Sequence, residues 1–333
     1  MKQVWIPHIG PPEVLELREV ADPEPGAGEV RIAVEAAGVN FADLMARQGL
    51  YQDAPPLPCV VGYEVSGVVD RVGDGVDHAW LGKPVLTLTR FGGYSSMVCV
   101  PASRLAVRPE GMSAAVAASI PVVYLTAWML LRVMGRVERG DRVLVHAAAG
   151  GVGLAAIDLC RDAGAEIWGS AGKAKHGFIE ARGVDHCLDS HADEMPTVGM
   201  DLILDARGGE SWARGLDALR PGGRLALFGM SSMARSGDSR SIVNALSALW
   251  AVPWLKMNPV ALINRNLGIL GVNMGHLWDE GERVGAWLAA ILVKHESGAI
   301  RPHVHAALPF SEAAEAHRIL HRRENIGKLV LVP

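Results

Sequence analysis

The sequence has few cysteines, few aromatic residues and no excess of one charge. Its 333 residues include four cysteines and 5% aromatic side chains, and 36 acidic residues nearly balance 32 basic ones. No two cysteines have the C-x-x-C spacing of a zinc knuckle, and the four do not form a disulfide framework. Because no block of Lys and Arg is present to neutralise phosphates, the composition argues against a nucleic-acid-binding protein.

The N-terminal residues 1–8 lack the long apolar core of a signal peptide, which predicts a reduced, cytoplasmic protein. Two stretches, 114–131 and 242–255, are apolar enough to attract attention as membrane spans. The first approaches the minimum length of a span, but Pro121 would break a spanning helix near its middle. A buried core helix is the favoured interpretation of the first stretch, and the second is too short to cross a membrane.

The first hundred residues have the alternating pattern of strands, most clearly at 30–36, with further candidates at 65–72 and 85–88. From residue 121 onward strands alternate with helices, which is typical of a doubly wound parallel sheet. The tail after residue 273 is predicted to run helix, strand, helix and a final strand. In the middle region the predicted strands are 142–146, 166–169, 201–205, 224–229 and 267–272, and the predicted helices are 151–163, 174–182 and 211–219. The fold class is therefore α/β.

A glycine-rich turn, His-Ala-Ala-Ala-Gly-Gly-Val-Gly over residues 146–153, lies between a predicted strand and a predicted helix. Glycines at 150 and 153 allow a tight turn and leave room for a pyrophosphate, which the helix N-terminus would bind through its free N–H groups. The alternative is a packing turn in another βαβ protein. The predicted contacts of a dinucleotide here are Ala149, Gly150, Gly151, Val152 and Gly153.

The end of the second strand, residues 169–175, decides which dinucleotide is favoured. Enzymes that use NAD usually place an acidic residue there to bind the adenosine ribose. This sequence has no carboxylate in the stretch, and Ser170, Gly172 and Lys175 could instead accommodate a 2′-phosphate. The residues thus favour NADPH over NADH. The alternative is that Lys173 and Lys175 are ordinary solvated residues.

Several motifs in order resemble the medium-chain dehydrogenase/reductase superfamily over essentially the whole chain. They are GVNFADLMARQGLY at 38–51, Leu-Pro at 57–58, GYEVSG at 62–67 and the glycine-rich turn about 100 residues later. The sequence is most similar to the zinc-free quinone oxidoreductase branch, which includes zeta-crystallin-like proteins. Its C-terminal half resembles homologues of the synaptic-vesicle membrane protein. That finer resemblance is carried by Lys-His at 175–176, Gly-Met-Ser at 229–231, IRPHV at 300–304 and NIGK at 325–328.

The resemblance implies a two-domain organisation. A GroES-like catalytic domain would take residues 1–120 and return over 273–333, and a Rossmann domain would take 121–272. The active site would lie in the cleft between them. A homodimer that pairs through an edge strand near 267–272 is also implied.

The resemblance also bears on metal binding. Zinc-dependent relatives carry Cys where this sequence has Asn40 and His where it has Tyr63, and the remaining Glu64 cannot hold zinc alone. His317 and His321 are one helical turn apart, but they lack the glutamate of a zincin motif. The sequence therefore predicts no metal.

The implied activity is NADPH-dependent hydride transfer to a quinone or to the activated C=C bond of an enone, a small apolar carbonyl substrate. Charge would then spread onto the carbonyl oxygen, where a neutral donor suffices. Tyr51 is the candidate donor, unless it merely packs before the Pro cluster. Asn40 would donate to the carbonyl or fix the nicotinamide, with Thr126 nearby.

Further cofactor contacts implied by position are Gly229, Met230, Asn273 and Asn325. Many relatives have Tyr where this sequence has Ser190, which leaves the 2′-phosphate to Ser170 and Lys175.

A second hypothesis is a membrane-associated or lipid-handling protein with little turnover. The stretch around Trp250, Trp254, Leu255 and Met257 would then be an apolar flap that touches lipid. The favoured interpretation of the same stretch is a helix that lines the substrate pocket or the dimer edge. An RNA-binding role, known for zeta-crystallin relatives, gains no support from the charge distribution.

Overall fold

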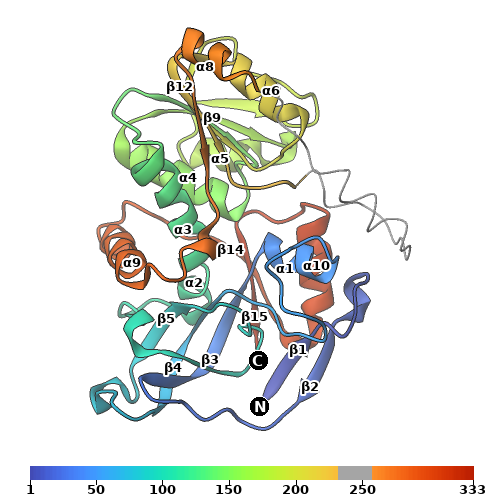
Figure 1. Ribbon diagram of the computed structural model, residues 1–333, viewed down its shortest axis with the longest axis vertical. Helices are drawn as coiled ribbons and strands as arrows, with labels where there is room; N and C mark the ends of the chain where they lie inside the picture. The colour runs from blue at the N-terminus through green and yellow to red at the C-terminus, as the bar shows by residue number, and fades with distance from the viewer. Residues whose placement is uncertain (232–256) are drawn as a thin grey trace.

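The computed structural model describes residues 1–231 and 257–333, which form two stacked domains (Figure 1). The upper domain in this view is built on a six-stranded sheet in which every neighbouring pair is parallel. In spatial order its strands are β10 (His186–Asp189), β9 (Glu166–Ala171), β8 (Arg142–His146), β11 (Met200–Asp205), β12 (Leu219–Leu227) and β13 (Gly268–Gly271).

The parallel sheet is buried on both faces, because alternate residues of its central strands pack into different cores. Val143 and Val145 of β8 join the core shared with the helices that cover one face, whereas Leu144 joins the core of Trp212 on the other. This explains why β8 is an unbroken apolar run rather than an alternating one. The helices of this domain are α3 (Pro121–Trp128), α4 (Gly151–Ala163), α5 (His176–Ala181), α6 (Glu210–Asp217) and α8 (Pro259–Arg265).

The lower domain is a β-rich unit around a seven-stranded sheet. Its strands are β14 (Val304–Pro309), β15 (Lys328–Val332), β3 (Glu29–Val39), β4 (Glu64–Val72), β5 (Pro84–Leu88) and β7 (Ala106–Val107), with β6 (Met97–Pro101) also paired to β3. A separate hairpin joins β1 (Lys2–Trp5) to β2 (Glu16–Glu19). Because β15 pairs with β3, the C-terminal tail returns to the N-terminal sheet. The tail also supplies α9 (Gly281–Glu296) and α10 (Ala313–His321).

The strands and helices predicted for the middle region are present, several with the predicted bounds. β8 and α4 begin and end where the sequence indicates, but β12 starts at Leu219, five residues before the predicted strand. One short helix, α1 (Phe41–Arg47), was not predicted within the β-rich region. At its start the backbone N–H of Asn40 donates to Asp43 Oδ2 (2.8 Å), and the Asp43 N–H donates to the backbone carbonyl of Asn40 (3.1 Å). Such a cap can start a helix that lacks a long amphipathic pattern.

The segment Ala114–Met134 is the one described helix that is long and apolar enough to cross a membrane by length and composition. It is interrupted between α2 (Ala114–Ala117) and α3, which has Pro121 at its first turn. Leu125, Leu130 and Leu131 are completely or almost completely buried in the core shared with α4. The structure therefore confirms the prediction that this stretch is buried in the core. The second apolar stretch, 242–255, lies outside the described residues.

Candidate active site

A cleft of about 3120 Å³ lies between the two domains. The carboxyl ends of the parallel strands form one wall, which includes Ala147 after β8, Gly172 after β9 and Ala206 after β11. α1 and the loop that follows it form part of the opposite wall. Open parallel sheets bind ligands in such a crevice, beyond the carboxyl ends of the strands.

The glycine-rich turn reaches this cleft at the N-terminus of the 13-residue helix α4. A Cβ atom on Gly153 would lie 2.3 Å from the carbonyl oxygen of Ala147, so this glycine is required by close packing. Gly150 has φ −80°, an ordinary value, and the left-handed residue of the turn is Ala147 at φ 52°. A Cβ atom on Gly150 would lie 3.2 Å from the same Ala147 carbonyl oxygen, so this position is crowded although its φ is open to any residue. The cradle and the free N–H groups at the start of α4 fit a pyrophosphate.

Ser170 and Lys175 both line the cleft, but they differ in what they already bind. The Ser170 hydroxyl is buried without a hydrogen-bond partner in the described structure, as expected of a group that awaits a ligand. The Lys175 ammonium donates to the carbonyl oxygens of Arg323 (2.5 Å) and Asn325 (2.7 Å), and burial lowers its pKa. Lys175 therefore anchors the tail and has one donor left for a phosphate. The Lys173 side chain is exposed, and its Nζ lies 3.5 Å from Asp189 Oδ2.

His146 is a polar residue of this wall to which the sequence analysis assigned no role. It is directly opposite Ser170 in the β8–β9 register, and both of its ring nitrogens are buried without a partner among the described residues. Burial lowers its pKa to about 4, so the imidazole is neutral at physiological pH. A histidine at the end of an otherwise apolar strand was the signal that could have identified it.

Asn40 begins α1 and has both ends of its side-chain amide bound by buried charged groups. Its Oδ1 accepts from Lys328 Nζ (2.7 Å), and its Nδ2 donates to Glu64 Oε1 (3.0 Å). Its backbone N–H donates to Asp43 Oδ2 at 2.8 Å. Sequence reasoning placed Asn40 in the site but gave Lys328 no role, because the contact joins residues 288 positions apart.

Asp43 binds several groups around Asn40 through hydrogen bonds. Its carboxylate also accepts from the Gly62 N–H (2.9 Å) and the Tyr94 hydroxyl (3.0 Å), and Tyr94 in turn contacts Nε2 of the buried His317 (3.3 Å). Burial raises the pKa of Asp43 to about 7 and lowers that of His317 to about 3. Asp43 thus orients its neighbours, and His317 is a core residue.

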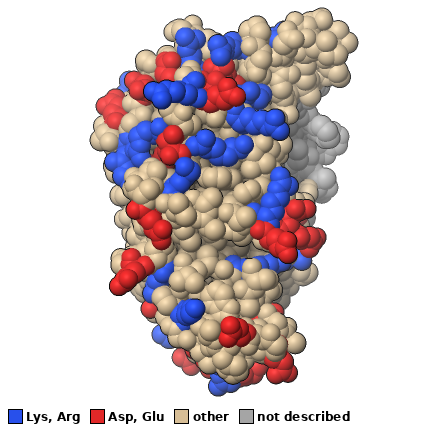
Figure 2. Space-filling view, turned by 90° about the vertical axis from the view of Figure 1, so that its left-hand side faces the viewer, with Lys and Arg blue, Asp and Glu red and all other residues tan. Residues whose placement is uncertain are grey.

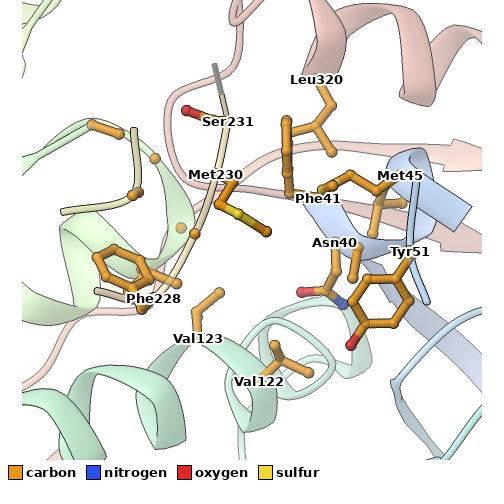
Figure 3. Close-up of a pocket in the computed structure, with 18 of the residues that line it drawn as sticks. Asn40, Phe41, Met45, Tyr51, Val122, Val123, Phe228, Met230, Ser231 and Leu320 are labelled. Atoms are coloured by element: carbon orange, nitrogen blue, oxygen red, sulfur yellow. The ribbon is translucent and has the colours of Figure 1, made fainter. Parts of the chain in front are cut away.

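Tyr51 follows α1 and points into the cleft (Figure 3). Its ring packs edge-on against Tyr63, with the centroids 6.2 Å apart. Burial, and secondarily the nearby Asp53 carboxylate, raise its pKa, so the phenol keeps its proton at neutral pH. The side chains around this space are mostly apolar and come from both domains: Phe41, Met45, Val122, Val123, Phe228, Met230 and Leu320.

The other predicted residues also line the cleft, although several polar atoms are already engaged. The Thr126 hydroxyl donates to the Val122 carbonyl (2.7 Å), so it can only accept from a ligand. Asn273 Oδ1 accepts from Gly275 N–H (3.0 Å), and Asn325 Nδ2 donates to the Gly327 carbonyl (2.7 Å). Gly229 and Met230 follow β12, and Ser190 follows β10. Of the predicted flap, only Met257 lies in the described residues, where it is exposed.

On one face of the protein, charged side chains of both signs are intermixed. Figure 2 shows one face, on which Lys and Arg lie among Asp and Glu. Among residues 1–231 and 257–333, no group of three or more His, Cys, Asp or Glu is arranged to hold a metal ion.

A β-rich domain, a parallel nucleotide-binding sheet and a glycine-rich turn in the cleft between them define a dinucleotide-dependent dehydrogenase or reductase. Family models agree: "Alcohol dehydrogenase GroES-like domain" matches residues 26–110, and "Zinc-binding dehydrogenase" matches residues 182–331. The chain belongs to the medium-chain dehydrogenase/reductase superfamily, as the sequence motifs predicted.

Three relatives illustrate the range of this family. The "Synaptic vesicle membrane protein VAT-1 homolog" of Homo sapiens is 38% identical over 96% of this chain and 82% of its own length. The quinone oxidoreductase of Escherichia coli, solved with NADPH, superposes with a TM-score of 0.86 at 27% identity and covers 100% of both chains. The CurK enoyl reductase superposes with a TM-score of 0.82 at 26% identity, over 99% of this chain and 98% of its own.

Proposed function

We propose that this protein is an NADPH-dependent, zinc-independent oxidoreductase that transfers hydride to a quinone or to the activated C=C bond of an enone. The observation that carries the proposal is the position of a protonated phenol, Tyr51, on an apolar wall of the cleft into which the glycine-rich turn opens. Two similar structures, a quinone oxidoreductase solved with NADPH and an enoyl reductase, support this chemistry.

The cofactor would lie with its pyrophosphate at the N-terminus of α4, between Ala149 and Gly153. When bound, NADPH supplies a hydride from its nicotinamide ring. Ser170 would face the adenosine ribose, where its unpartnered hydroxyl suits a 2′-phosphate. On the nicotinamide side, Gly229, Met230 and Asn273 would border the ring.

The chain's own part in the reaction is to stabilise charge without a metal. When hydride adds to the β-carbon, the C=C electron pair forms a new double bond between the α-carbon and the carbonyl carbon. The C=O pair then moves onto the oxygen, which Tyr51 would bind through its O–H group. A proton from solvent then completes the reduction at the α-carbon. The donor set supports zinc independence, because Asn40 and Tyr63 are poor ligands and Glu64 is already bound to Lys328 at 2.6 Å.

The first test is calorimetry of NADPH and NADH binding, followed by stopped-flow oxidation of NADPH with a panel of quinones and enones. We expect tighter binding of NADPH, weakened by Ser170→Ala, and turnover of enones or quinones but not of saturated ketones. Zinc chelation should leave the rate unchanged. Failure to bind either nucleotide would refute the proposal.

The name of the human relative motivates a second candidate, a membrane-associated protein with little turnover. Within the described chain, the membrane-length segment 114–134 has 67% of its most apolar part buried, which favours the enzyme. Liposome flotation separates the two. Salt-insensitive flotation without NADPH oxidation would favour the membrane role, and the absence of flotation would favour a cytoplasmic enzyme.

A further inference from the structure

A buried ion pair, Lys328 with Glu64, lies directly behind Asn40. The two charged atoms are 2.6 Å apart, and the side chains are 5% and 0% exposed. The ammonium donates to Glu64, to Asn40 Oδ1 (2.7 Å) and to the Val39 carbonyl (2.7 Å), which uses all three of its protons. Glu64 Oε2 accepts from the backbone N–H of Val122 (2.8 Å) at the start of α3. The ammonium and the carboxylate are thus both bound by protein groups, which stabilises one arrangement of the pair.

This pair decides which way the Asn40 amide faces. An ammonium can only donate, so it must meet the amide oxygen, and a carboxylate can only accept, so it must meet the amide nitrogen. Rotating the amide by 180° would replace both attractive contacts with repulsive ones. The second amide proton has only a 3.4 Å contact with the Gly38 carbonyl, longer than an ordinary N–H···O bond. Because Oδ1 is already engaged and this proton is weakly held, the Asn40 amide can serve a ligand in the cleft as a donor.

The pair is assembled where the two domains meet. Lys328 is the first residue of β15, and its side chain packs against the glycine-rich turn, since a Cβ atom on Gly151 would lie 3.1 Å from Lys328 Cδ. The preceding Gly327 donates its N–H to the Ala149 carbonyl (2.8 Å). The residues that orient Asn40 thus also contact the segment expected to bind the cofactor.

We propose that Lys328 and Glu64 are positioning residues that hold the Asn40 amide with its N–H toward the substrate carbonyl. Asn40 then joins Tyr51 as the second donor to the developing oxyanion. The inference rests on the proposed function, because it assigns roles within that reaction. It goes beyond that function by placing orientation control in a buried pair whose charged groups are bound by other protein groups.

The test replaces the pair by two neutral amides, Lys328→Gln with Glu64→Gln, which retain hydrogen-bonding capacity but no longer dictate the orientation of Asn40. We expect kcat with an enone to fall about 10- to 100-fold, as for a misplaced catalytic group, with a larger kinetic isotope effect from C4-deuterated NADPH. The Kd of NADPH should change less than about twofold. Glu64→Gln alone keeps the orienting ammonium and should lose much less of kcat.

A matched control removes another buried pair, Asp158 with Arg182, 2.8 Å apart and outside the cleft. Asp158→Asn with Arg182→Met should lower the melting temperature without the loss of kcat. If the Gln–Gln variant does not fold, Lys328→Met with Glu64→Gln provides the same comparison. A double variant that folds and keeps wild-type kcat would overturn the inference. A wild-type protein that reduces no quinone or enone would instead overturn the proposed function, and the inference with it.

Discussion

At the residue scale, the proposed reaction depends on Tyr51 as the hydrogen-bond donor. We expect Tyr51→Phe to lower kcat about 10- to 100-fold, because it removes a hydrogen bond that forms fully only as charge develops on the substrate oxygen. The Kd of NADPH should be unchanged. Stopped-flow oxidation of NADPH measures the rate, and Tyr124→Phe is the control, since that hydroxyl bonds Asp158 in the core. An unchanged rate in Tyr51→Phe would show that Tyr51 only packs.

At the same scale, Asp43 makes the protein's free energy of unfolding depend on pH. Burial raises its pKa from 3.8 to about 7, so the folded protein holds a proton that the unfolded chain has released in this interval. This group's contribution to stability is present below pH 4 and is lost as the pH rises through 7. Urea unfolding should therefore show a fall of about 2 kcal/mol in the free energy of unfolding between pH 5 and 8.

Asp43→Asn should flatten this pH dependence, because an amide does not titrate, whereas Asp74→Asn on an exposed turn should leave it as in the wild type. A wild-type stability that rises with pH by an amount lost in Asp43→Asn would contradict the predicted direction.

At the scale of elements, close packing in the turn between β8 and α4 requires a glycine at position 153. The Gly153 position is closed on two sides, since a Cβ atom would lie 2.3 Å from the Ala147 oxygen and 2.6 Å from the Ala148 oxygen. We expect Gly153→Ala to lower the free energy of unfolding by about 2 kcal/mol and to weaken NADPH binding by at least about tenfold. Thermal denaturation and calorimetry measure the two effects.

Gly177 in α5 is the matched control, because no atom lies within 4 Å of its would-be Cβ. Gly177→Ala should leave binding unchanged and raise stability by about 0.5–1 kcal/mol. Equal losses in the two variants would mean that the turn is not specially constrained.

At the scale of the whole molecule, β13 ends the parallel sheet, as the sequence predicted for the last strand. We propose that two copies pair through this edge, which lies beside the exposed Ile263 (72%) of α8. Ile263→Glu should shift a dimer to a monomer in sedimentation velocity without loss of stability. Val293→Glu, a comparably exposed position on α9, should not. A wild-type monomer at micromolar concentration would exclude the dimer.

The sequence alone determined the α/β class, most strands and helices of the middle region, and the glycine-rich turn, because these depend on local periodicity and on short motifs. It did not predict α1 or the edge strand β10. It also pointed to three residues that line the cleft: Asn40 through resemblance, Ser170 through its position after the glycine-rich turn, and Tyr51 as a neutral donor. Only the tertiary structure revealed the partners of those residues: Lys328 and Glu64 on Asn40, and the tail carbonyls on Lys175. These contacts join positions from 24 to 288 residues apart, and nothing in a local pattern encodes a distance between distant segments.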